Sequence, residues 1–268
     1  MSAFSLDPYR PGSSAVHRLD SRVRLALVTA FILTVALQPP AAWAAYLLLA
    51  SLVLAAAVLA ELPAAYLLKR GLLALPFVLA ALPLLFILPG RPLSVFDLGF
   101  ATLTLTQPGL ERFLSILFKA LISLQAAVIL AATTPFPDLL VALRWFRLPR
   151  LLVAVIGLMW RYLFIMVETA ARLLRARASR SADSGRSGLH TGGRLVWRAR
   201  VTGGMAGSLL LRSFERGERV YAAMLARGYD GEARGLPAPP LDRRAWGLVL
   251  VGWLVLLALL LFGWLLAG

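Results

Sequence analysis

Two short arginine motifs carry the clearest chemistry in the sequence. Ser179-Arg180-Ser181 and Ala226-Arg227-Gly228 each place one arginine between two small residues at the C-terminal end of a helical pattern. Small neighbours leave the guanidinium accessible, and its planar fork of N–H donors matches the two oxygens of a carboxylate. Arg180 and Arg227 could therefore bind acidic side chains in a groove of another protein.

A purely structural role explains the same two motifs equally well. Arginines at a helix C-terminus complement the helix dipole and attract anionic lipid headgroups. Against this role stand the repetition of the small-Arg-small pattern and an apolar seam in which Gly217 would allow close approach of another helix. The pattern alone does not decide between the two roles. The seam consists of Leu210, Phe214, Gly217, Tyr221 and Met224.

The composition indicates an integral membrane protein. Of the 268 residues, 60% are hydrophobic and 15% are charged, whereas an ordinary soluble domain has about 25% charged residues. Long apolar runs predict an all-α fold with about five transmembrane helices and long amphipathic helices on the cytoplasmic side. The absence of cysteine excludes disulfides and thiolate metal sites.

The transmembrane helices are predicted from five apolar runs at residues 23–37, 42–60, 72–88, 110–132 and 246–266. Each approaches the roughly 20 residues that a helix needs to cross a bilayer. The two prolines of the third run should kink it or require it to pack against neighbouring helices.

Two features beside or within these runs need separate interpretation. The connection at residues 89–108 contains VFDLGFATLTL, which we interpret as a short re-entrant or interfacial element. Lys119 lies inside the fourth run, and packing within the bundle explains it better than a role in transport.

The uneven charge predicts the orientation in the membrane. The formal net charge is +15, and 19 of the 28 lysines and arginines fall between Pro135 and Ala245, against eight acids. Cytoplasmic segments carry an excess of Lys and Arg. We therefore expect a multi-pass protein of the cell membrane with the N-terminus and residues 135–244 in the cytoplasm.

Helical patterns recur within that basic segment. A short helix is expected at residues 138–146 and longer ones at 150–177 and 204–227, with Gly228 as the C-cap of the last. The pattern at 150–177 starts apolar, but crossing the membrane there would carry the basic segment outward. We therefore predict that this helix lies along the underside of the membrane. Glu215 and Arg219, four residues apart, should form a surface pair.

Motifs for catalysis are absent from the sequence. It has no Gly-x-x-x-x-Gly-Lys-[Ser/Thr] run for nucleotide, no H-E-x-x-H and no G-x-S-x-G. His17 and His190 lie far apart in polar segments and are improbable metal ligands. The isolated acids give little support to a proton-relay transporter. The chain is thus expected to be no enzyme and to hold neither a metal nor a cofactor.

The sequence resembles a known family, the transmembrane T component of energy-coupling-factor (ECF) transporters of the ATP-binding-cassette class, in its cobalt-type CbiQ branch. The resemblance covers nearly the whole chain. It begins at HRLDSRVRLAL, continues through RLPRLLVAVIGLMWRYLFIMVETAARLLRARASR and is strongest in LLLRSFERGERVYAAMLARGYDG.

The resemblance implies a non-catalytic coupling subunit of an importer, with cobalt as the expected ion and nickel or a vitamin as alternatives. Two cytoplasmic ATPases would bind ATP and the two arginine motifs, and a separate membrane subunit would bind the substrate. Ala226-Arg227-Gly228 matches the second family motif fully. Ser179-Arg180-Ser181 aligns with the first, with Arg177 as the alternative arginine.

The implied organisation has four parts: a cytoplasmic arm (residues 1–24), a four-helix transmembrane region (25–134), a cytoplasmic coupling-helix region (135–244) and a C-terminal transmembrane helix (245–268). The lipid bilayer is a further partner, and nucleic acid is not expected to be one. The competing hypothesis is a stand-alone secondary ion transporter or channel, which would need no ATPases. A lipid-modifying enzyme is a third, for which the sequence offers no catalytic group.

Overall fold

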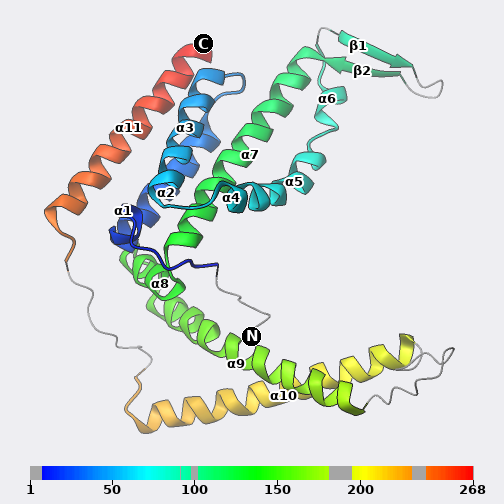
Figure 1. The fold of residues 1–268 in the computed structure, drawn as a ribbon, viewed down its shortest axis with the longest axis vertical. Coiled ribbons are helices and arrows are strands. Elements are labelled where there is room, and N and C mark those ends of the chain that lie inside the picture. Colours follow the sequence, from blue (N-terminus) through cyan, green and yellow to red (C-terminus); the bar gives the residue numbers. More distant parts are fainter. Residues whose placement is uncertain (1–7, 91, 98–101, 181–194, 231–239, 268) are drawn as a thin grey trace. The chain divides into compact units, whose positions relative to one another are not determined.

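The computed structural model describes residues 8–90, 92–97, 102–180, 195–230 and 240–267 (Figure 1). The chain divides into two compact units. The bundle unit comprises Met1–Trp145 and Ala238–Gly268, and the helix-pair unit comprises Phe146–Pro237. Apart from one small β-hairpin, every regular element described is a helix. The predicted all-α membrane fold is confirmed in this respect.

Four long helices lie side by side in the bundle unit (Figure 1). They are α2 (Ser21–Leu37), α3 (Trp43–Leu59), α7 (Gln107–Thr133) and α11 (Arg243–Ala267), and the four-residue α1 (Ala15–Arg18) precedes them. Helix α2 packs against α7, α11 and the short α8 (Phe136–Trp145), so it occupies the centre of the unit. The core between these helices includes Val35, Tyr46, Leu49, Ala126, Ile129 and Leu256.

The helices coincide with the predicted apolar runs because turn residues delimit them. The Asp20 carboxylate caps α2 by accepting a hydrogen bond from the Arg22 backbone N–H at 2.9 Å. At the other end, α2 stops just before Gln38-Pro39-Pro40, since a proline lacks the N–H that a continuing helix needs.

The third predicted run is broken, as its prolines suggest. The run at residues 72–88 forms a 3-10 turn (Leu72–Ala74), α5 (Leu75–Ala80) and α6 (Leu84–Ile87), and α4 (Ala64–Gly71) precedes it. Pro76 lies in the first turn of α5 and Pro83 is the N-cap of α6. These are positions where the missing backbone N–H costs least.

The predicted re-entrant or interfacial element contains an antiparallel β-hairpin of β1 (Pro92–Asp97) and β2 (Thr102–Thr106). Its register pairs Pro92 with Thr106 and Asp97 with Thr102. The alternation of Thr and Leu along β2 has the two-residue period of a strand rather than the 3.6-residue period of a helix. The alternation therefore indicates a strand more clearly than the overall hydrophobicity of the segment does.

Lys119 has a structural role in the bundle. Its ammonium group donates hydrogen bonds to the carbonyl oxygens of Ala36 and Gln38, at 3.0 and 2.7 Å. These carbonyls end α2 and have no intrahelical partner of their own. Beside them, Ser115 Oγ accepts a hydrogen bond from the Ala41 N–H at 3.0 Å, and Tyr46 donates one to the Pro39 carbonyl at 2.8 Å. The expected packing role of the lysine agrees with these contacts.

The surface of the bundle unit is that of a membrane protein. Large apolar side chains point outward, with Leu54 62%, Val58 76% and Leu265 82% exposed. Among the described residues, four segments are long and apolar enough to cross a membrane: Ala64–Ile87, α7, α11 and Arg150–Arg180 of the helix-pair unit. Helix α3 is also apolar but shorter. The placement of residues 150–180 along the membrane underside stays a prediction.

The helix-pair unit consists of α9 (Arg150–Arg180) and α10 (Leu195–Ala226). Helix α9 follows the Arg147-Leu148-Pro149 turn, in which Arg147 has a positive φ of 61°. Helix α10 begins nine residues before the predicted position 204, because Leu, Val, Trp, Arg and Ala at its start all tolerate a helix despite the later glycines.

Candidate functional site

Helices α9 and α10 form an antiparallel pair that cross each other (Figure 1). Near the end of α9, Arg177 Nη1 donates a hydrogen bond to Thr202 Oγ1 in the first part of α10, at 2.9 Å. Leu158 precedes Arg177 by nineteen residues on α9, and Tyr221 follows Thr202 by nineteen residues on α10. Both side chains line one groove. Matching offsets in opposite directions define the antiparallel register.

That groove, of about 430 Å³, separates the two helices. Its α9 wall includes Leu158, Met159, Tyr162 and Met166, and its α10 wall includes Gly217, Val220, Tyr221 and Met224. Methionine side chains adapt to irregular apolar surfaces. The pairing of α9 with α10 is therefore apolar but loosely packed, and no residue of α9 is fully buried.

The predicted apolar seam of α10 is only partly correct. Gly217, Tyr221 and Met224 do face α9 across the groove. Leu210 and Phe214 are 58% and 65% exposed. The close approach expected at Gly217 is wrong, since a Cβ placed there would meet no atom within 4 Å. The helices cross rather than run parallel, so only one part of the seam reaches α9.

The first arginine motif lies at the end of α9. Arg180 is the last helical residue and is exposed. Ser179 Oγ donates a hydrogen bond to the Ala176 carbonyl at 3.0 Å, which satisfies one acceptor of the final turn. Ser181, the third residue of the predicted motif, lies outside the described residues. Arg177, the alternative arginine, is bonded to Thr202 as described above.

The second arginine motif ends α10 in a Schellman cap. Gly228, with φ of +80°, donates its N–H to the Leu225 carbonyl at 2.9 Å, and Tyr229 donates its N–H to the Met224 carbonyl at 3.0 Å. This is the 5→2 and 6→1 pattern of the motif. The predicted C-cap at Gly228 is confirmed, and Arg227 is held at the cap position next to Ala226, the last helical residue.

Sequence reasoning missed Tyr229 as part of this cap. A hydrophobic residue just after the glycine often packs on the residue five positions earlier, and here both Tyr229 and Met224 line the groove. The spacing of Met224, Gly228 and Tyr229 is the signal that would have found it. The ring therefore ties the Arg227 cap to the α9–α10 contact.

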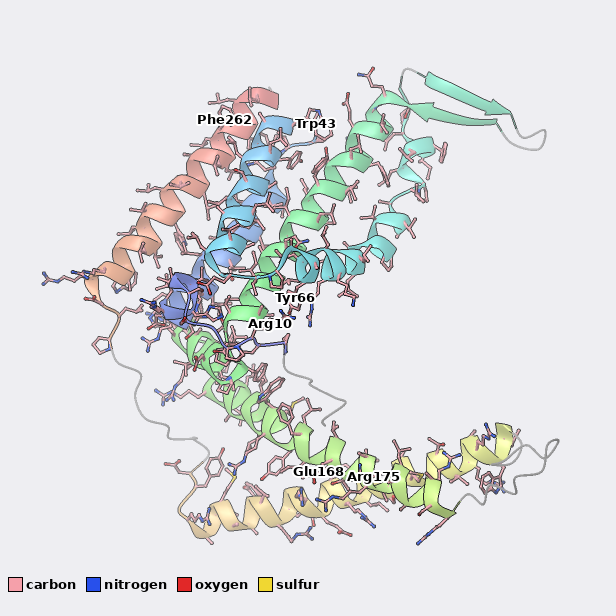
Figure 2. All side chains as sticks on the ribbon, in the orientation of Figure 1. Arg10, Trp43, Tyr66, Glu168, Arg175 and Phe262 are labelled. Carbon is pink, nitrogen blue, oxygen red and sulfur yellow. The ribbon has the colours of Figure 1, made fainter. Side chains whose placement is uncertain are left out.

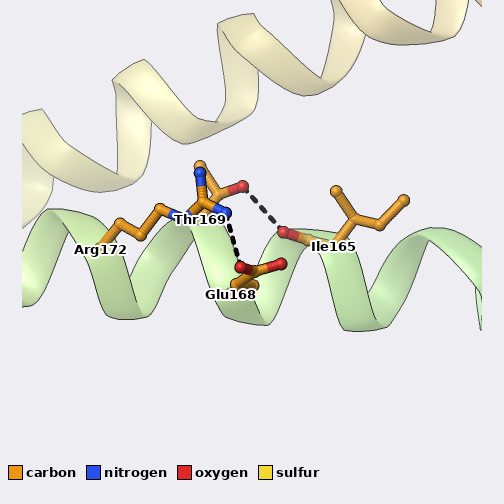
Figure 3. A network of polar contacts seen from close by, with 4 residues as sticks. All are labelled: Ile165, Glu168, Thr169 and Arg172. Atoms are coloured by element: carbon orange, nitrogen blue, oxygen red, sulfur yellow. Dashed lines mark hydrogen bonds and ion pairs between the residues drawn. The ribbon is translucent and has the colours of Figure 1, made fainter.

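Ion pairs between described residues lie on the exposed faces of both helices, each within one helix, and these pairs do not join α9 to α10. On α9, Arg172 donates to the Glu168 carboxylate at 2.5 Å, and Thr169 donates to the Ile165 carbonyl at 2.8 Å (Figure 3). On α10, Arg219 and Glu215 approach to 3.9 Å, as their spacing predicts. All four charged side chains are more than half exposed. Exposed pairs of this kind contribute about 0–1 kcal/mol.

The antiparallel register separates the two motifs. Thr202 lies beside the last turns of α9, and 25 residues separate it from Arg227. At about 1.5 Å per residue, Arg227 is roughly 40 Å further along α10. The two motifs thus lie at opposite ends of the pair (Figure 1). No hydrogen bond or ion pair joins the guanidinium of Arg180 or Arg227 to another described residue.

Metal ligands are not gathered in the described part of the chain. No group of three or more His, Cys, Asp or Glu side chains that could hold an ion occurs there. His17 contacts Ser14 Oγ and the Arg10 carbonyl, and His190 lies outside the described residues.

The apolar bundle unit and the basic helix-pair unit together define a multi-pass membrane protein. The model of the cobalt transport protein family, CbiQ, matches residues 12–237, which is most of the chain. The chain therefore belongs to the CbiQ cobalt transport family.

Several curated proteins are similar to this chain. The cobalt transport protein CbiQ of Rhodobacter capsulatus is 29% identical over 151 residues, which cover 56% of this chain and 58% of that protein. An uncharacterized protein of Methanocaldococcus jannaschii is 28% identical over 47% of this chain and 44% of its own length. The chain thus aligns with about half the length of these two relatives. The energy-coupling factor transporter transmembrane protein EcfT of Bacillus subtilis is 28% identical over 86% of both chains.

Proposed function

We propose that this chain is the coupling subunit of an ECF-type importer. In this role Arg180 and Arg227 bind acidic grooves on two cytoplasmic ATPase subunits. The chain passes their ATP-driven movement to a separate membrane subunit that binds the substrate. ATP is bound and hydrolysed on the partners, and the chain itself carries no cofactor.

The observation that carries this proposal is the arrangement of the two arginine motifs. Both end a long helix, both guanidinium groups are exposed, and they are separated by roughly 40 Å along α10. A separation of this size suits two protein partners that bind side by side better than one small ligand. A guanidinium without an internal partner is available for bidentate binding to a carboxylate.

The contacts at the end of α9 favour Arg180 over Arg177 as the first docking arginine. Arg177 donates to Thr202 within the helix pair. Docking through Arg177 would break that bond, whereas docking through Arg180 would not. The Ser179 hydroxyl is likewise bonded to its own helix.

Exposed apolar surface supports a membrane partner. Within α10, Leu210, Leu211 and Phe214 are each more than half exposed, and within α9 so are Leu151 and Met159. Apolar surface of this extent is covered in a native assembly by lipid or by another protein. The positive-inside bias favours a cytoplasmic location for the helix-pair unit, where the underside of the membrane and the substrate-binding subunit would cover it.

A contact between two tryptophans could transmit movement of the helix-pair unit to the helices of the bundle unit. The chain leaves the bundle unit after Trp145 of α8 and re-enters it at Ala238, shortly before α11. The rings of Trp145 and Trp246 pack together with centroids 5.8 Å apart. This contact joins α8, which precedes one connection to the helix-pair unit, to α11, which follows the other, so a displacement of either helix would be passed to its neighbour.

Cobalt is the proposed ion, on the strength of the family and of the relatives named CbiQ. Metal ions of this kind are bound by imidazole, thiolate and carboxylate groups, which are not gathered in the described part of this chain. We therefore place the ion on the separate membrane subunit. The groove that the described bundle residues form between α2, α3, α7 and α11 is about 380 Å³. Leu27, Phe31, Leu52 and Leu256 are among its lining residues, and all are apolar.

The test is co-purification from membranes that contain the whole transporter. The tagged chain should retain two ATP-binding-cassette subunits. The substitutions Arg180→Glu and Arg227→Glu should each reduce the amount of ATPase that co-purifies. Losing one partner of a buried charge pair costs about 2–5 kcal/mol in affinity, which is at least a tenfold reduction. Arg219→Glu, on the exposed face of α10, is the matched control.

Two outcomes would reject the proposal. One is full retention of the ATPases by both charge-reversal variants. The other is cobalt flux into liposomes that contain the purified chain alone, which would favour the stand-alone transporter.

A further inference from the structure

Tyr66 of α4 holds two arginines against one aromatic ring. The Arg10 Cζ atom lies 4.1 Å from the ring centroid and the Arg70 Cζ atom 5.0 Å from it. Both distances are within the range of a cation–π contact. Figure 2 shows Arg10 beside Tyr66 in the bundle unit. The two arginines come from segments far apart in the sequence, so the fold brings their charges together.

The backbone of Arg10 is fixed by several elements. Its N–H donates to the Ala132 carbonyl at the end of α7, at 2.9 Å, and its own carbonyl pairs with His17 Nε2 at 3.1 Å. A carbonyl can only accept, so this nitrogen of His17 carries the proton. Tyr66 also donates its hydroxyl to the Pro8 carbonyl at 3.5 Å. The N-terminal segment is therefore docked so that Arg10 stays over the ring.

The charge gathered at Tyr66 lacks a counterion within the described chain. Lys69, exposed on α4, adds a third cation beside Arg70. None of the ion pairs among the described residues joins Arg10, Lys69 or Arg70 to a carboxylate. Like charges this close repel, and the ring offsets only part of that repulsion. An anion bound here would remove it.

The depth of this cluster matches the headgroup layer of a bilayer. Helix α7 has 27 residues and is roughly 40 Å long, about 10 Å more than the hydrocarbon core. The cluster contacts its last part, since Arg10 bonds to Ala132 and Gln125 donates to the Leu67 carbonyl at 3.1 Å. The cations therefore lie near one end of α7, where a helix of this length reaches the headgroup layer.

Apolar surface adjoins the cations. Leu68 is 71% exposed and Leu72, one turn later, is 60% exposed. Two uncovered leucines next to three cations make a surface with a charged part and an apolar part. That combination matches a phospholipid, which has a phosphate and acyl chains, and a free phosphate ion would leave the leucines uncovered.

We propose that Arg10 and Arg70, arranged on Tyr66, bind the phosphate group of an anionic phospholipid whose acyl chains cover Leu68 and Leu72. The site is separate from the arginine motifs of the helix-pair unit and does not depend on the proposed coupling function. Bound lipid also holds the N-terminal segment against α4 and α7, because Arg10 belongs to that segment.

The experiment is native mass spectrometry of the purified full chain in detergent with an equimolar mixture of phosphatidylglycerol and phosphatidylcholine. The wild type should retain phosphatidylglycerol preferentially. Arg10→Gln and Arg70→Gln should each lower that preference about fivefold, the effect of one cation near an anionic membrane surface, and the double variant should abolish it. Arg112→Gln, an exposed arginine near the opposite end of α7, should leave it unchanged.

Charge-preserving variants separate lipid binding from folding. Arg70→Lys should keep most of the preference, whereas a purely structural role for the guanidinium would make it as damaging as Arg70→Gln. Equal retention of both lipids by the wild type, or equal loss in Arg112→Gln, would overturn the proposal. A second arm adds inorganic phosphate at millimolar concentration. If phosphate displaces phosphatidylglycerol as readily as added phosphatidylglycerol does, the site takes the free ion and the lipid assignment is wrong.

Discussion

Arg177 of α9 donates a hydrogen bond to Thr202 of α10 at 2.9 Å, while Arg180, one turn further on, ends the helix with its side chain exposed. The bond is a polar contact between the two helices that supports their antiparallel register, beside the apolar groove. Two arginines three residues apart are thus given different surroundings. One takes part in holding the helix pair together and the other faces outward.

These different surroundings predict opposite effects for two alanine substitutions. Arg180→Ala should reduce ATPase retention at least tenfold and leave hydrogen exchange in α9 and α10 unchanged. Arg177→Ala should increase exchange around Thr202, because an exposed hydrogen bond worth about 1 kcal/mol is lost, and should retain most of the ATPase. Pull-down and hydrogen exchange on the same two proteins provide the comparison. ATPase loss in Arg177→Ala alone would identify Arg177 as the docking residue instead.

We expect Gly228 to be required because of its backbone conformation, and not because a side chain at this position would clash with a neighbour. Its φ is +80°, and a Cβ there would meet nothing within 4 Å. The left-handed conformation costs an L-residue about 1–2 kcal/mol, so Gly228→Ala should fray the end of α10 and weaken ATPase binding through Arg227. Gly228→Asn is the matched control, since asparagine adopts this conformation more readily. Hydrogen exchange at residues 224–229 is the direct measurement, and equal protection in Gly228→Ala would contradict the prediction.

Much of this fold could be predicted because its signals are local. Apolar runs bounded by prolines located α2, α3, α7 and α11 to within three residues. Gly228 identified its cap for the same reason, since a helix end is encoded by a few neighbouring residues.

What could not be predicted depends on distant partners. The Lys119 contacts join residues more than 80 positions apart, and the cluster on Tyr66 joins Arg10 to α4. The seam of α10 was expected to be continuous, but the crossing of α9 and α10 leaves Phe214 exposed. Periodicity gives the apolar face of a helix and does not give the crossing angle that decides how much of the face is covered.

Lys119 provides a test of packing against transport. Lys119→Met keeps the length of the side chain but removes the donors to the Ala36 and Gln38 carbonyls. Hydrogen bonds from a charged group contribute about 1.5–3 kcal/mol, so the variant should unfold at lower denaturant by a comparable free energy. Lys119→Arg retains donors and should be closer to wild type. Unaltered stability of Lys119→Met, together with abolished cobalt uptake by the assembled transporter, would instead assign the lysine to transport.

Two glycines of α11 should respond with opposite sign to the same substitution. At Gly263 a Cβ would overlap Gln38 Oε1 and lie 3.3 Å from the Ala45 Cβ. Gln38 is buried and donates to the Leu259 carbonyl at 3.1 Å, so Gly263→Ala must displace it and break that bond. We expect a loss of about 1–3 kcal/mol in the free energy of unfolding.

Gly247 is the matched position, because a Cβ there meets nothing within 4 Å. Gly247→Ala should stabilise α11 by about 0.5–1 kcal/mol, since alanine loses less conformational entropy in a helix. Equilibrium unfolding of both variants in mixed micelles measures the two signs. Adding Gln38→Ala to Gly263→Ala tests the mechanism, because the two changes should be less damaging together than their sum. Strict additivity would mean that the Gly263 side of α11 does not press on Gln38.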